Sequence, residues 1–180
     1  MLDDPIRYGL LAALAIALLT AAFTDLRRRH IDNWLNAGIA VTAPLYWWAS
    51  GLSLWPGVAL QVGVALATFA ALAVLFALRA MGGGDVKLLA AFGAWLGPAL
   101  VCWVAIYGAI AGGLLALLLV LWRGRLRATI ANVWGMVTYW RLAGLKPHPV
   151  VTLDNPGAVR MPGALSIALG ALATLWLRVW

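Results

Sequence analysis

Two aspartates lie at positions where an apolar chain rarely carries an acid. Asp25 ends the apolar run 6–24, and Asp85 precedes the apolar run that begins at residue 86. The dipole of a helix repels a carboxylate at its C-terminal end, so the position of Asp25 is unfavourable. A local ion pair with the arginines that follow would make this acid tolerable, although an exposed pair contributes only about 0–1 kcal/mol. Ionisable residues at membrane depth indicate a functional site by default.

Asp25 and Asp85 can face each other if the helices that carry them are neighbours. Two close carboxylates do not both ionise easily, so such a pair holds one proton near neutral pH. One member can then deprotonate a water molecule while the other protonates a leaving amine. This is the chemistry of an aspartic protease, and Asp25 and Asp85 are our candidate catalytic residues. The same two acids would also suit a transport or a structural role.

Three glycines, Gly82, Gly83 and Gly84, directly precede Asp85. An aspartate at the start of a helix can be an N-cap residue, which is the structural interpretation of Asp85. A cap needs no glycine triplet, however, and each glycine raises the conformational cost of ordering the chain. The triplet therefore indicates that the backbone approaches something closely here, such as a partner helix or an extended peptide.

The remaining acidic residues have ordinary explanations. Asp3 and Asp4 lie in the N-terminal tail, Asp154 lies in a proline-rich loop, and Asp32 resembles an N-cap, which contributes about 1 kcal/mol. The single cysteine, Cys102, can form neither a disulfide nor a cysteine zinc site within one chain. We expect no metal ion and no cofactor.

The composition places these residues in a membrane. Of 180 residues, 64% are hydrophobic and 11% are charged, whereas soluble domains have about half and about a quarter. A membrane-spanning helix needs about 20 apolar residues. We predict an all-α membrane protein, a single integral-membrane domain over 1–180 with a bundle of six transmembrane helices. The predicted spans are 6–24, 34–50, 57–78, 86–97, 99–122 and 162–180, the fourth and fifth being divided at Gly97-Pro98.

Basic residues orient this bundle. With the N-terminus outside, eleven of the 13 Lys and Arg residues fall in inner loops, as the positive-inside rule requires. Because the basic residues flank apolar runs, the net charge of +7 indicates membrane topology and not nucleic-acid binding. Within the long inner segment 123–161, Ile130, Val133, Trp134, Val137 and Trp140 recur at helical spacing. They predict a short amphipathic helix in the interface with membrane lipids.

The segment Gly82-Gly83-Gly84-Asp85-Val86-Lys87 resembles the GxGD signature of the type IV prepilin peptidases, which opens a membrane helix in that family. The family's first aspartate lies at the end of an earlier span, before a basic stretch and an Ile-Pro-Asn tripeptide. Here Asp25 is followed by three arginines and then by Ile31-Asp32-Asn33. Near the C-terminus, Met161-Pro162-Gly163 and the following 166–170 are similar to a third family motif. The resemblance covers the whole peptidase core, with Asp32 in place of the usual proline.

This resemblance implies a membrane aspartic endopeptidase of the bacterial inner membrane with Asp25 and Asp85 as its catalytic pair, facing the cytosol. Gly82, Gly83, Gly84, Lys87 and Asn33 would support the site or the substrate. The substrate would be a prepilin, cut between a short basic leader and a hydrophobic helix. The larger family members carry an N-terminal region with paired cysteines and methyltransferase activity. The chain is expected to be a compact peptidase-only form, similar to those of tight-adherence (Flp-type) pilus systems.

Other classes of protein are also compatible with paired acids in a membrane. A small transporter or ion-coupled carrier would use them for ion pathways, but it predicts inverted repeats, and the sequence contains no internal repeat. A structural subunit of a pilus or secretion assembly would pair them with arginine. Proteases of the presenilin-like branch would need a longer chain with both acids on later helices.

Overall fold

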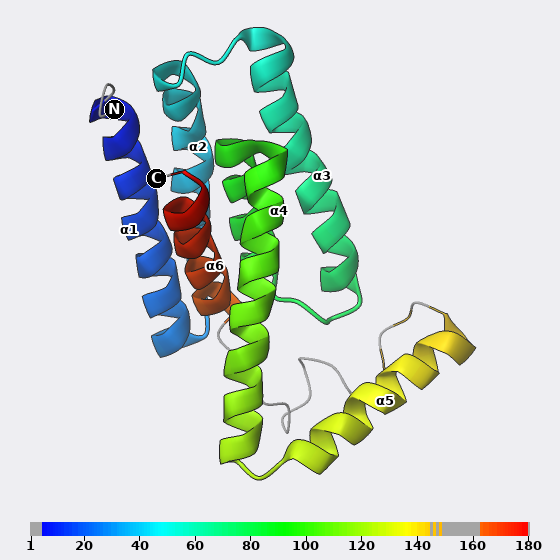
Figure 1. The fold of residues 1–180 in the computed structure, drawn as a ribbon. Coiled ribbons are helices and arrows are strands. Elements are labelled where there is room, and N and C mark those ends of the chain that lie inside the picture. Colours follow the sequence, from blue (N-terminus) through cyan, green and yellow to red (C-terminus); the bar gives the residue numbers. More distant parts are fainter. Residues whose placement is uncertain (1–4, 145, 147, 149–162, 180) are drawn as a thin grey trace.

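The computed structural model describes residues 5–144, 146, 148 and 163–179, and the regular secondary structure of this part consists of helices joined by short connections (Figure 1). The elements in chain order are α1 (Pro5–Arg28), α2 (Asn33–Ala49), the short helical segment η1 (Leu54–Val58), α3 (Ala59–Ala77), α4 (Gly83–Trp122), α5 (Leu126–Ala143) and α6 (Gly163–Arg178). The fold class predicted from composition is therefore confirmed as all-α.

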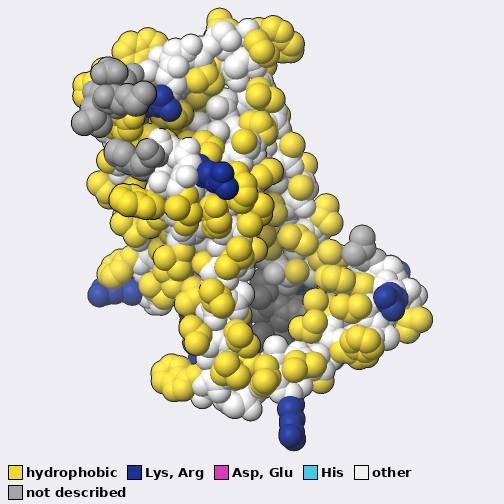
Figure 2. Space-filling view, viewed as in Figure 1, with side chains coloured by type: hydrophobic (Ala, Val, Ile, Leu, Met, Phe, Trp, Pro, Cys, Tyr) yellow, Lys and Arg dark blue, Asp and Glu magenta, His cyan; other side chains and the backbone are white. Residues whose placement is uncertain are grey.

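Helix α4 is the centre of the bundle. It packs against α6, α3 and α2, and α6 in turn packs against α1, so that α6 lies between α1 and α4 (Figure 1). The first part of α4 is buried on most sides, and Phe92 and Trp95 are its largest fully buried side chains. By contrast, no residue of α3 is buried. The face of the bundle seen in Figure 2 is covered by hydrophobic side chains with few charged ones between them, as expected for contact with lipid.

Three helices are long and apolar enough to cross a membrane, namely α1, η1 together with α3, and α4. Helix α2 has 17 residues and α6 has 16. Helices occur at all six predicted spans, but the six-span count stays a prediction. The N-terminal boundary predicted for the fourth span differs from the structure. The helix begins at Gly83 and not at residue 86, because its first turn consists of glycines and Asp85, which an apolar run does not include.

The predicted division of the fourth and fifth spans is present as a break inside α4. Gly97 has φ 76° and ψ −176°, a conformation that favours glycine, and Pro98 follows it. Proline at position 98 cannot donate a hydrogen bond to the carbonyl of Ala94, four residues earlier. The indole Nε1–H of Trp47 on α2 donates to that carbonyl at 2.7 Å. The partner α2 thus satisfies the acceptor that the break leaves free, which matters where no water is at hand.

A second indole hydrogen bond links the same two helices, with donor and acceptor helices exchanged. Trp95 on α4 donates from Nε1 to the carbonyl of Ile39 on α2 at 2.6 Å, and its ring stacks on Tyr46 with centroids 5.1 Å apart. Because each helix donates one indole N–H to the other's backbone, the α2–α4 register is fixed by two directional bonds in addition to apolar contact.

The residues predicted to form an interfacial helix all lie on α5, which leaves the bundle at an angle after α4 (Figure 1). None of its residues is buried, and Ile130, Val133 and Trp134 are among its exposed hydrophobic side chains. The helix itself is therefore confirmed, while its place in a membrane interface stays a prediction.

Candidate active site

Asp25 lies in the last turn of α1, at the dipole end that disfavours an acid, and it is only 7% exposed. Its Oδ2 accepts a hydrogen bond from the backbone N–H of Ala164 at 3.0 Å. Ala164 belongs to the first turn of α6. The N–H groups there have no partner within the helix, and the positive end of the helix dipole lies there. The acid that is misplaced with respect to α1 is therefore well placed with respect to α6.

Asp85 is the third residue of α4 and not its N-cap. Gly82 occupies the N-cap position, without a side-chain capping bond. The Asp85 carboxylate lies directly against the Cα of Gly163, the residue before Ala164, so closely that a Cβ on Gly163 would overlap it. Both predicted catalytic acids thus reach the same turn of α6, one through Gly163 and the other through Ala164.

The three glycines before Asp85 each have a different neighbour. A Cβ on Gly82 would lie 3.1 Å from Oδ2 of Asp85, one on Gly83 would lie 3.2 Å from the ring of Phe76, and one on Gly84 would lie 3.1 Å from Ile31. Of the two explanations for the triplet, the structure supports close intramolecular packing. The glycines thus allow the start of α4 to pack closely against the Asp85 carboxylate, against the end of α3 and against the α1–α2 connection.

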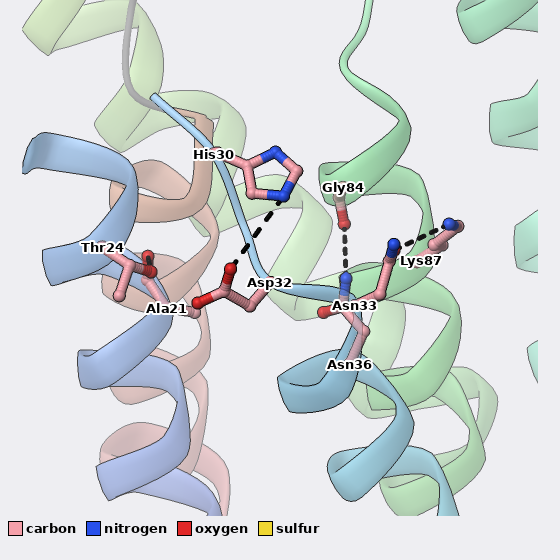
Figure 3. Close-up of polar contacts among 8 residues, drawn as sticks. All are labelled: Ala21, Thr24, His30, Asp32, Asn33, Asn36, Gly84 and Lys87. Carbon is pink, nitrogen blue, oxygen red and sulfur yellow. Dashed lines mark hydrogen bonds and ion pairs between the residues drawn. The ribbon is translucent and has the colours of Figure 1, made fainter. Parts of the chain in front are cut away.

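Lys87 and Asn33 join the starts of two helices (Figure 3). Lys87 Nζ donates to Oδ1 of Asn33 at 2.9 Å, so the structure brings these two predicted site residues together. One turn further along α2, Asn36 donates from Nδ2 to the carbonyl of Gly84 at 3.3 Å. Asn36 was not predicted as a site residue, although an amide three residues after Asn33 in an otherwise apolar helix was a usable signal.

Asp32 occupies the N-cap position of α2, as predicted, but its side chain makes no capping hydrogen bond. Its Oδ1 lies 4.0 Å from Nε2 of His30 in the α1–α2 connection instead (Figure 3). The expected cap contribution of the side chain is therefore absent. The backbone carbonyl of Asp32 accepts from the N–H groups of Leu35 and Asn36, which are the first hydrogen bonds of the helix itself.

The third predicted motif is only partly within the described residues. Met161 and Pro162 lie outside them, while Gly163 and 166–170 belong to α6. Sequence reasoning used Gly163 as a motif residue and missed Ala164, whose contribution is a backbone N–H and leaves no trace in residue type. Among the described residues, no group of three or more His, Cys, Asp or Glu side chains could together hold a metal ion.

The fold and this junction define a class, a helical membrane protein with two acids brought together at the start of one apolar helix. Residues 12–117 match the model of the type IV leader peptidase family, so the chain belongs to that family. Two curated relatives are the prepilin leader peptidase/N-methyltransferases of Burkholderia pseudomallei strains 1026b and K96243. Each is 30% identical over 124 residues, a match that covers 63% of the chain and 38% of the relative. No solved structure matches the chain significantly.

Proposed function

We propose that the protein is a membrane aspartic endopeptidase that removes the leader peptide from prepilins or prepilin-like proteins, with Asp25 and Asp85 as its catalytic pair. Family membership supports a prepilin peptidase role. The observation that carries the assignment of residues is the meeting of both carboxylates at Gly163 and Ala164. A small transporter has less support, because it predicts inverted repeats and the sequence contains no internal repeat.

The reaction follows from two carboxyl groups that share one proton. The ionised member accepts a proton from a bound water as the water oxygen attacks the carbonyl carbon of the scissile bond. The protonated member then gives its proton to the amide nitrogen, and the C–N bond breaks as the tetrahedral intermediate collapses. The products are a leader with a new carboxylate and a pilin with a new amine. Ala164 N–H acts as a positioning group, since it holds one oxygen of Asp25.

The membrane arrangement belongs to the same proposal. We place six spans in the bacterial inner membrane with the N-terminus outside, so that Asp25 and Asp85 lie at the cytosolic face. Helix α5 would lie on that face, with its exposed apolar side chains in the lipid interface and its arginines near anionic headgroups. This orientation lets a leader peptide that remains in the cytosol reach the two acids.

Cleavage of a purified prepilin by the purified protein in detergent tests the proposal. Asp25→Asn and Asp85→Asn should each lower kcat by about 10²–10⁴-fold, the usual contribution of a general acid or base. Asp32→Asn is the matched control. It replaces a carboxylate by an amide in the same way, but at an aspartate that lies near His30, and this variant should cleave prepilin normally. Normal cleavage by either Asp25→Asn or Asp85→Asn would refute the catalytic pair.

A further inference from the structure

An open groove of about 460 Å³ runs along α4 between α2 and α3. Helix α4 lines it with Lys87, Ala90, Ala91 and Ala94, and α2 lines it with the equivalent set Asn33, Asn36, Ala37 and Ala40. Each set has the spacing of a single helix face. Six of the residues that line the groove are alanines, and the polar ones gather at the end near the start of α4.

Alanine walls are suited to a helix as occupant. Within a membrane, apolar side chains gain little by leaving lipid, so helices associate through close packing and through hydrogen bonds, and small residues at the contact allow both. From Lys87 to Ala94, seven residues at about 1.5 Å each give a groove roughly 10 Å long, about two turns of a helix. The groove thus fits the first turns of an apolar helix.

Asn36 indicates that the occupant brings hydrogen-bond donors. The side chain is 4% exposed, and while Nδ2 bonds to Gly84, its Oδ1 is buried without a hydrogen-bond partner in the described part of the chain. A buried acceptor without a partner is uncommon and destabilising. The first four N–H groups of a helix lack partners within it, whereas a lipid acyl chain has no donor. Asn36 also lines the groove, so its Oδ1 lies beside the space that such an N–H would occupy.

We infer that the groove binds the beginning of the substrate's apolar helix, with Asn36 accepting from a backbone N–H in its first turn. This inference rests on the proposed function, which supplies a substrate that has such a helix next to the cleaved bond. Helix α3 forms the outer wall of the groove and buries none of its residues. The groove therefore lies near the lipid, from which the substrate helix could enter it.

The groove and the acids lie on different faces of α4. Asp85 and Lys87 are two residues apart, which corresponds to a turn of about 200° around the helix. The peptide between the docked helix and the scissile bond must therefore pass around the start of α4 in extended form. Half the circumference of a helix about 10 Å across is roughly 16 Å, which about five residues at about 3.3 Å each span. The docked helix would start about that far beyond the cleaved bond.

Filling the groove tests the inference. Ala37 is exposed in the groove on α2, and Ala37→Trp should raise the KM for full-length prepilin roughly tenfold or more, the loss expected when one well-packed contact surface is blocked. It should leave kcat within about twofold, since the acids are not touched. Ala67→Trp is the matched control, because Ala67 is exposed on α3 and does not line the groove.

A second measurement does not depend on turnover. In a Cys102→Ala background, Ala40→Cys should form a disulfide with a cysteine placed in the first turns of the prepilin helix, and Ala67→Cys should not. An unchanged KM in Ala37→Trp, or equal cross-linking at both positions, would overturn the groove assignment even if prepilin is cleaved. Absence of cleavage by the unmodified protein would instead overturn the proposed function, and the cross-link would still decide whether the groove binds the helix.

Discussion

Adding one methyl group at Gly163 tests whether catalysis depends on the observed junction of α6 with Asp85. In Gly163→Ala the new Cβ would lie 2.7 Å from Cγ and from Oδ1 of Asp85. Carbon atoms in van der Waals contact are about 3.5–4.0 Å apart, so the carboxylate or the start of α6 must move by roughly 1 Å. The Asp85 side chain is partly exposed and can turn away, so the fold should survive.

A misplacement of that size in a catalytic group costs about 10²-fold in rate. We therefore expect kcat for prepilin cleavage to fall about 10²-fold, with little change in KM, because the groove for the substrate helix lies on the opposite face of α4. Cleavage is measured by the appearance of mature pilin on gels over a range of prepilin concentrations. Circular dichroism and thermal unfolding in detergent show whether the helices remain.

Gly113→Ala is the control for the loss of a glycine. Gly113 lies inside α4, and a Cβ there would meet nothing within 4 Å. It should cleave normally and unfold at a slightly higher temperature, since alanine favours a helix by about 0.5–1 kcal/mol over glycine. If folded Gly163→Ala cleaves prepilin as fast as the unmodified protein, the position of the Asp85 carboxylate against α6 is not required, and the reasoning fails.

Two further predictions concern the contacts that hold the site's helices together. Trp47→Phe removes the donor to the Ala94 carbonyl and should lower the free energy of unfolding by about 1–3 kcal/mol. The control Trp48→Phe changes a side chain that is 74% exposed and should leave the free energy of unfolding unchanged. Equal melting temperatures of the two variants would contradict the role of the indole. Gly170→Ala would place a Cβ 2.6 Å from the Cα of Gly108. This overlap should push α6 away from α4 and lower the free energy of unfolding by about 1–3 kcal/mol. An unchanged melting temperature would show that the two helices are not in close contact.

Much of the fold was predictable because it depends on local apolar content. Runs of apolar residues mark the helices, and Gly97-Pro98 marks the break in α4, since both effects act within a few residues of the chain. The start of α4 was predicted three residues late for a local reason too, because its first turn is built from Gly83, Gly84 and Asp85 and not from apolar residues.

The hydrogen bonds between these helices were not predictable in the same way. The Trp47 indole and the Ala94 carbonyl are 47 residues apart in sequence, and a carbonyl released by proline can be satisfied by any nearby donor. Asn36 likewise looks like one polar residue in an apolar helix until its contact with Gly84 is known. These bonds depend on helix order and rotation, which hydrophobic periodicity does not specify.

Asp25 shows that the environment of a helix position also depends on the neighbouring helix. On α1, Asp25 opposes the helix dipole, and this made it a candidate for function rather than for structure. In the folded chain Ala164, 139 residues later, supplies the N–H that holds it, so part of its role is structural. The two roles are compatible, because the bond that offsets the cost of burying Asp25 also fixes it beside the helix turn that contacts Asp85. A change in the first turn of α6 should therefore affect both acids at once, which distinguishes a shared site from two independent capping residues.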